Sequence, residues 1–135
     1  MVARFLLDTN ICIYISNHNP PEVRARFQQH PASDLAMSVI TLGELRFGAE
    51  KSQSRLRAMA IIEQLQSQMA VLPLSAESAR IYGELRARLQ REGKPIGNND
   101  LWIAAHALAE GCVLVTNNTR EFERVEGLML ENWVG

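Results

Sequence analysis

Short apolar runs recur along this chain, and segments with helical spacing separate them. The runs cover 4–7, 35–38, 70–74, 112–116 and, more weakly, 128–130. Apolar runs of this length suit strands that are buried on both faces, as in parallel sheets. Strands that alternate with helices over short connections build a sheet covered on both sides. The pattern predicts an α/β fold: a three-layer α/β/α sandwich around a short, mainly parallel sheet of four to five strands.

The segments between these runs have the spacing of helices. Their apolar residues recur at intervals of three and four, as on one face of a helix. Helices are expected over 11–15, 20–29, 40–51, 56–68, 75–93 and 97–110. Ser75 supplies an N-cap for the fifth of these helices, and Gly111 supplies a stop for the sixth.

Length and composition narrow the class of protein. A chain of 135 residues suits a single domain, 1–135. Its formal net charge is −1, so any contact with a polyanion must come from a local patch. No run approaches the roughly 18 apolar residues of a membrane-spanning helix, and we expect no secretion signal. Cys12 and Cys112 are expected to be free, buried thiols, which fits a cytoplasmic protein without membrane contact.

Two of the three aspartates lie in unusually apolar surroundings, FLLDTNICIYI around Asp8 and IGNNDLWIAAHALA around Asp100. Asp8, Ser38 and Thr116 fall at the carboxyl ends of expected strands, where open α/β sheets bind their ligands. Each aspartate alone also has an ordinary explanation. Asp8 suits a helix N-cap, and Asp100 suits a first-turn acid that complements the helix dipole.

Glu44 is a third candidate acid. It shares a helix face with the apolar Ile40, and the flanking Gly43 and Gly48 would let another element come close. A solvated glutamate beside Arg46 is the alternative. Mg²⁺ prefers carboxylate and water oxygens, so three gathered acids would suit it.

Other catalytic patterns are missing from the sequence. The three histidines have no metal-ligand spacing and receive no role, and His106, on an apolar helix, is expected to be an ordinary packed or surface residue. There is no nucleophile elbow, P-loop, Cys-x-x-Cys pair or dinucleotide fingerprint. The carboxylates are therefore the main candidates for chemistry.

Four segments in order resemble the motifs of the PIN-domain family, in particular the VapC-type toxins of bacterial toxin–antitoxin pairs. They are LLDTN at 6–10, SVITLGEL at 38–45, KPIGNND at 94–100 and LVTNNTREFERVEGL at 114–128. The resemblance covers essentially the whole chain. It implies an endoribonuclease that uses Mg²⁺, or Mn²⁺ in its place, to hydrolyse tRNA or another structured RNA loop, leaving 5′-phosphate and 3′-hydroxyl ends.

The resemblance also implies a site. Asp8, Glu44 and Asp100 would be the catalytic and metal-binding acids. The family often has a fourth acid after the strand that ends at Thr116, whereas this chain has Asn118 there, which favours one tightly bound metal ion over two. Supporting roles are implied for Asn10, Ser38, Thr116, Asn118 and Glu121, with ordinary turn hydrogen bonds as the alternative. Arg46 and Arg120 are candidates to bind substrate phosphate.

Partners follow from the same resemblance: an RNA substrate, a cognate VapB-like antitoxin, a second copy in a homodimer, and a larger toxin–antitoxin assembly. Two other functions stay open. In a receiver- or phosphatase-like domain, Asp8 would accept a phosphoryl group, although no second acid stands two residues later. In a catalytically weak RNA- or partner-binding module, Asn118 would mark a degraded site. Metal-dependent RNA cleavage discriminates among the three.

Overall fold

A computed structural model describes residues 3–135. The strands are β1 (Phe5–Leu7), β2 (Leu35–Ser38), β3 (Ala70–Leu72), β4 (Val113–Val115) and β5 (Leu130–Glu131). They form one sheet in the order β3-β2-β1-β4-β5, and every neighbouring pair is parallel. The predicted α/β class and parallel sheet are confirmed.

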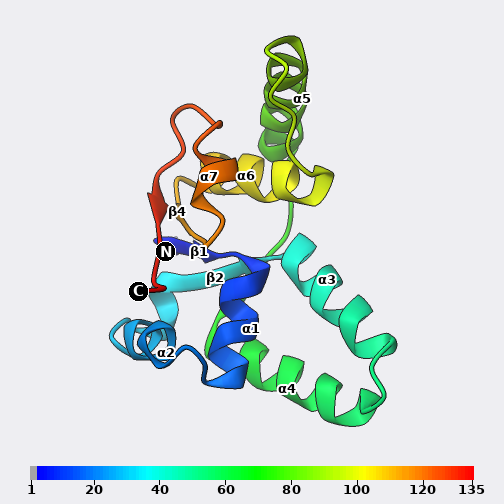
Figure 1. Cartoon of the computed structure of the whole chain (residues 1–135), viewed down its shortest axis with the longest axis vertical. Coiled ribbons are helices and arrows are strands. Elements are labelled where there is room, and N and C mark those ends of the chain that lie inside the picture. Colours follow the sequence, from blue (N-terminus) through cyan, green and yellow to red (C-terminus); the bar gives the residue numbers. More distant parts are fainter. Residues whose placement is uncertain (1–2) are drawn as a thin grey trace.

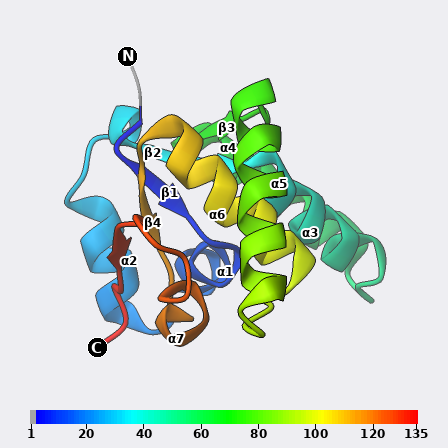
Figure 2. The ribbon, with the colours of Figure 1, turned by 90° about the horizontal axis from the view of Figure 1, so that it is seen from above.

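Helices connect these strands and cover both faces of the sheet. They are α1 (Thr9–Asn17), α2 (Pro21–Gln28), α3 (Val39–Glu50), α4 (Arg55–Gln68), α5 (Ala76–Arg91), α6 (Asn98–Glu110) and α7 (Thr119–Phe122), with a 3₁₀ turn at Ala32–Asp34. Figure 1 shows α1, α2 and α4 on one side of β1 and β2, and α5, α6 and α7 on the other. Figure 2 shows α5 and α6 lying side by side.

The central strand β1 divides the interior into two apolar clusters. Successive side chains of a strand point to opposite faces. Phe5 and Leu7 accordingly pack with α1 and α2, while Leu6 packs with α5 and α6. Alternate residues of β1 thus contact the helix layers on the two faces of the sheet. The predicted three-layer sandwich is confirmed.

Several element boundaries differ from the predicted ones. The third strand ends at Leu72, because the following Pro73 lacks the N–H that a ladder requires. The fifth strand lies at Leu130–Glu131 rather than 128–130, since Leu130 is the residue that pairs with Leu114 of β4. The short helix α7 was not predicted.

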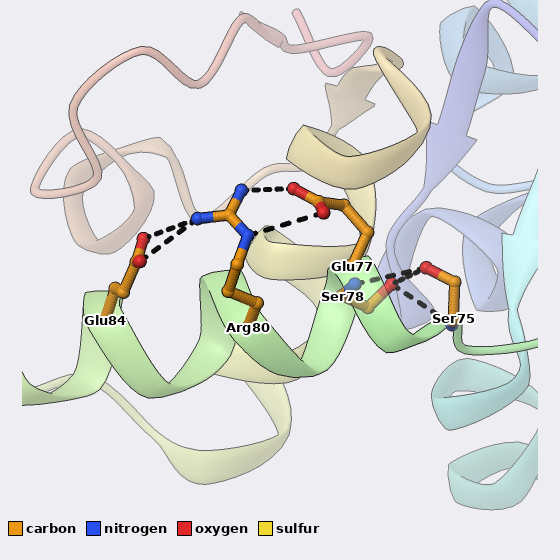
Figure 3. A network of polar contacts seen from close by, with 5 residues as sticks. All are labelled: Ser75, Glu77, Ser78, Arg80 and Glu84. Atoms are coloured by element: carbon orange, nitrogen blue, oxygen red, sulfur yellow. Dashed lines mark hydrogen bonds and ion pairs between the residues drawn. The ribbon is translucent and has the colours of Figure 1, made fainter.

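The N-terminus of α5 has the capping predicted at Ser75. Its Oγ accepts from the N–H of Ser78 at 3.1 Å, and the Ser78 Oγ accepts from the N–H of Ser75 at 3.3 Å (Figure 3). Further along, Arg80 pairs with Glu77 and Glu84 on the exposed face. Exposed pairs contribute little to stability, so the cap matters more for where α5 begins.

Two further expectations concern thiols and membranes. Cys12 and Cys112 are free and buried, as predicted, and burial raises the pKa of the Cys112 thiol to about 11. Within residues 3–135, no helix has both the length and the apolar character needed to cross a bilayer.

Candidate functional site

Asp8 directly follows β1 and begins α1. It is 5% exposed; its Oδ1 accepts from the N–H of Thr9 and its Oδ2 from the hydroxyl of Thr116, each at 2.8 Å. Burial raises the pKa of Asp8, the hydrogen bonds from Thr116 and Thr9 oppose that rise, and the charges of Glu44 and Glu121 add to it. Asp8 is therefore both the N-cap of α1 and a carboxylate held at the carboxyl end of the sheet.

Glu44 reaches the same region from α3. The hydroxyl of Thr9 donates to its Oε1 at 2.5 Å, and Nδ2 of Asn99 lies 3.4 Å from its Oε2. The Thr9 hydroxyl is also 3.2 Å from that of Thr41 on α3. Glu44 is thus tied to α1 and α6, and the alternative of a freely solvated glutamate is wrong.

Asp100, in the first turn of α6, shares a hydrogen bond with Glu121 of α7. Burial is the largest cause that raises the pKa of Asp100 to about 7, followed by that hydrogen bond and the charges of Asp8, Glu121 and Glu44. Burial also raises the pKa of Glu121, but hydrogen bonds from Gly97, Asp100 and Asn118 outweigh it and leave that pKa lowered. The opposite directions of the two pKa shifts make Asp100 the donor in this hydrogen bond and Glu121 the acceptor.

Backbone and amide donors hold Glu121 in place. The N–H of Gly97 donates to its Oε1 at 2.9 Å, and Nδ2 of Asn118 donates to its Oε2 at 2.5 Å. The N–H of Asn118 in turn donates to the Thr116 hydroxyl at 2.9 Å, and that hydroxyl donates to Asp8. A continuous hydrogen-bonded path therefore joins Glu121 to Asp8.

The donor chemistry of this cluster suits a hard divalent cation. Its four acids supply only oxygen atoms, which are the ligands of Mg²⁺ and Mn²⁺. Burial, the hydrogen bond with Glu121 and the charges of the other acids together raise the pKa of Asp100 to about 7, and a bound cation would offset these charges. Among residues 3–135, no three acid, His or Cys side chains already stand at metal-ligand spacing. The residues therefore fit a hard divalent cation chemically.

Other predicted residues lie apart from the acids. Asn10 is exposed on α1, and Ser38 is buried and bonded to His106 instead. Arg46 contacts the sulfur of Met59 at 3.6 Å, and Arg120 is exposed on α7. In the described part of the chain neither guanidinium hydrogen bonds to one of the four acids, so their role in phosphate binding stays a prediction.

Several residues of the site were not predicted from the sequence. Thr9 and Asn99 orient Glu44, and the N–H of Gly97 orients Glu121. Thr9 and Asn99 lie inside the motif segments 6–10 and 94–100, which is the one signal that could have identified them. Their partners are 35, 55 and 24 residues away, so spacing along the chain does not reveal them.

Two grooves flank Glu44. One, of about 690 Å³, runs along α3 past Phe47 to Asn99 and Lys51. The other, of about 250 Å³, lies between α1, α3 and α4 and is mainly apolar, with Ile13 and Leu45 in its wall. Of the four acids, Glu44 is therefore the one that lines these grooves, together with Thr9.

The fold and the site together define a class of protein. An α/β/α domain with acids gathered at the carboxyl ends of parallel strands is suited to cation-assisted chemistry on phosphate groups. Comparison with known families then identifies the chain: it belongs to the PIN-domain family, whose model matches residues 5–128. This membership argues against the receiver-like alternative.

Known relatives cover almost the full chain. A protein of Haemophilus influenzae named Ribonuclease VapC2 is 47% identical over 98% of this chain and 100% of its own length. A Shigella flexneri protein named tRNA(fMet)-specific endonuclease VapC is 48% identical over 98% of this chain and 99% of its own. A chain of DNA-bound VapBC from Salmonella typhimurium superimposes with a TM-score of 0.92 at 43% identity, covering 98% of this chain and 99% of that one.

Proposed function

We propose that this chain is a Mg²⁺-dependent endoribonuclease, the toxin of a VapBC-like toxin–antitoxin pair. The observation that carries the proposal is the gathering of Asp8, Glu44, Asp100 and Glu121 from four separate parts of the chain, where burial and their charges raise the pKa of Asp100 to about 7. Relatives of nearly the same length are named ribonucleases. The proposed metal ligands are Asp8 and Asp100, with Glu44 beside them, and Mn²⁺ substitutes for Mg²⁺.

The mechanism assigns each acid a task. Asp8 and Asp100 would hold the cation, which would lower the pKa of a water molecule and neutralise charge on the phosphate. Thr116 and Thr9 hold the Asp8 carboxylate in one orientation. Thr9 and Asn99 aim Glu44, which accepts a proton from the attacking water. Asp100 would have to lose its proton to serve as a ligand, and Glu121, its hydrogen-bond partner, is a carboxylate placed to accept that proton.

The substrate we propose is a tRNA or another structured RNA with an exposed loop. The support is the name of the Shigella flexneri relative, which is specific for tRNA(fMet), and the groove beside Glu44. Phe47 in that groove is 65% exposed, and the Lys51 ammonium lies 4.7 Å from its ring centre. An exposed ring next to a cation suits an unpaired base and its phosphate.

The partner we propose is a VapB-like antitoxin that docks in the apolar groove between α1, α3 and α4. That groove shares Thr9 and Glu44 with the proposed substrate groove, so a bound partner would cover Glu44. The close structural match to a VapBC complex supports such a partner. We further propose a homodimer within a larger toxin–antitoxin assembly, located in the cytoplasm where the RNA substrate is.

Asp8→Asn is expected to slow Mg²⁺-dependent RNA cleavage by about 10³-fold, because several kcal/mol of cation-assisted stabilisation would be lost. The measurement is a map of new RNA 5′ ends after brief induction of the parent and the variant in cells, followed by cleavage of the mapped RNA by purified protein.

Asp34→Asn provides the matched control. Asp34 is the remaining aspartate, pairs with Arg4 at 3.8 Å and lies outside the acid cluster, so this variant should cleave like the parent. Cleavage by Asp8→Asn at the parental rate, in preparations free of contaminating nuclease, would show that the proposed function is wrong. A parent protein that binds RNA without cutting it would favour the binding-module alternative.

Asn118→Asp is expected to lower the stability of the metal-free protein and to raise its affinity for the metal ion. The new carboxylate would replace a donor to Glu121 with a like charge. We expect the metal-free melting temperature to fall by about 2–5 °C, the shift that roughly 1 kcal/mol produces in a domain of this size. Calorimetric titration should show Mn²⁺ binding about tenfold tighter, or a second bound ion, because a fourth carboxylate is available.

Asn117→Asp is the control for this change. Asn117 accepts from Nδ2 of Asn132 at 3.3 Å and is exposed, and an aspartate there keeps the acceptor. Equal effects from both variants, or an unchanged affinity in Asn118→Asp, would contradict the prediction.

A further inference from the structure

A buried polar pair joins α6 to the start of α3. Ser38 and His106 are both 0% exposed, and the Ser38 Oγ lies 2.8 Å from the His106 Nδ1. The same Oγ accepts from the N–H of Ile40 at 3.1 Å and so caps α3. Since that hydroxyl has a single hydrogen and already accepts from Ile40, it is best placed to donate to Nδ1. The ring is then neutral, with its remaining hydrogen on Nε2.

The second ring nitrogen of His106, Nε2, is buried and lacks a well-placed hydrogen-bond partner among the described residues. The backbone group that acts on the ring is Pro73, which can only offer its carbonyl. An apolar side chain at 106 would avoid this desolvation cost within the apolar cluster around α6. A buried polar pair at this position therefore points to a role other than stability.

The position of the pair suggests that role. Ser38 ends β2 and stands six residues before Glu44, while His106 stands six residues after Asp100 on α6. The hydrogen bond therefore links the two helices that carry these acids. At the site itself the same helices meet through the 3.4 Å contact of Asn99 with Glu44. One of these two contacts lies in the interior and the other lies beside the acids. Contacts at two points restrict both sliding and rotation of α3 against α6.

We propose that His106 is a positioning residue that acts through Ser38, fixing the first turn of α3 against α6 and thereby setting the separation of the Glu44 and Asp100 carboxylates. The inference rests on the proposed function, in which Asp100 binds the metal and Glu44 acts beside it. Apolar contacts are non-directional, whereas a buried hydrogen bond selects one alignment of the two helices. Metal ligands require that alignment to within about 0.5 Å.

The test compares three single variants in the full-length protein. His106→Leu and Ser38→Ala remove the hydrogen bond, and His106→Asn keeps an amide carbonyl that can accept from the Ser38 hydroxyl. We expect the first two to weaken Mn²⁺ binding by about tenfold, as loss of a partner behind a metal ligand does. His106→Asn should stay within about threefold of the parent. The Ser38→Ala/His106→Leu double variant should be no weaker than the worse single variant.

Leu89→Val is the control for general loss of stability. Leu89 is buried on α5 in the same apolar cluster but lies outside the hydrogen-bonded path to the acids. This variant should lower the free energy of unfolding and leave the Mn²⁺ dissociation constant unchanged. An unchanged constant in His106→Leu, or an equal loss in Leu89→Val, would overturn the proposal, because His106 would then be only a packing residue.

A second readout does not depend on metal. Amide hydrogen exchange in the first turns of α3 should speed up in His106→Leu relative to the parent, beyond any change in global stability, and return towards the parental rate in His106→Asn. Unchanged protection there would also overturn the proposal. If the parent neither binds Mn²⁺ nor cuts RNA, the proposed function fails, and the exchange measurement still decides whether His106 positions α3.

Discussion

Asp100→Asn is expected to change activity and stability in opposite directions. RNA cleavage should fall by about 10³-fold, because a proposed metal ligand and its charge are lost. The metal-free protein at pH 7.5 should nevertheless melt at a higher temperature than the parent. Burial and the charges of neighbouring acids raise the pKa of Asp100 to about 7, so its ionised form is disfavoured in the folded state. An uncharged amide avoids that repulsion.

The pH dependence follows from the direction of this shift. The ordinary pKa of Asp100 is 3.8 and the folded value is about 7, so the folded state holds a proton that the unfolded chain releases. The associated stability is fully present below pH 3.8 and is lost as the pH rises through about 7. The metal-free parent should therefore lose stability over this range more steeply than Asp100→Asn, as measured by thermal unfolding at a series of pH values.

Metal addition provides the complementary measurement. Mg²⁺ should raise the melting temperature of the parent at pH 7.5, since a ligand that binds only the folded state stabilises it. Asp100→Asn should show little of that rise, and Asp34→Asn should behave like the parent in both measurements. A lower metal-free melting temperature in Asp100→Asn than in the parent would contradict the assignment of repulsion to this cluster.

Trp133→Ala is expected to be the most destabilising single change near the C-terminus, by about 3–5 kcal/mol, as for other buried Trp-to-Ala replacements. Trp133 is 1% exposed, stacks on His30 with ring centres 5.5 Å apart, and meets the Phe5 ring edge-on at 6.0 Å. Its indole N–H also donates to Glu131 at 2.7 Å. Loss of the ring leaves a cavity beside β1 and removes the anchor of β5.

Trp102→Ala is the matched control, because it removes the other tryptophan. Trp102 is half-buried and stacks on Tyr82 with ring centres 3.8 Å apart. Its replacement should cost about 1–2 kcal/mol, since less of the ring is removed from water. Denaturant unfolding monitored by the remaining tryptophan measures both variants. Equal losses would show that the C-terminal segment is not anchored as described.

The fold was largely predictable because its signals are local. The runs at 35–38 and 112–116 are buried on both faces, and such strands show their burial directly in composition. The strand β5 is only two residues long, and its place is decided by pairing with β4. The helix α7 has four residues, too few to show helical periodicity. Elements of this size depend on their neighbours.

The candidate site was predictable only in part. Asp8, Glu44 and Asp100 could be named because acids in apolar segments are unusual and the motifs containing them resemble those of a known family. Ser38 was given a supporting role, but its partner His106 was given none. That partner is 68 residues away, and no pattern along the chain predicts so distant a hydrogen bond.

The alternation of apolar runs with helical segments determined, without further information, that this chain forms a parallel sheet covered on both faces, because burial and periodicity are properties of neighbouring residues. The motifs determined which acids could share a site. Only the tertiary structure decided that Glu121 hydrogen bonds to Asp100, that the pKa of Asp100 is raised to about 7, and that a buried serine–histidine pair links α3 to α6. Those properties depend on distances through space and on exclusion of water, and both arise only when the segments pack together.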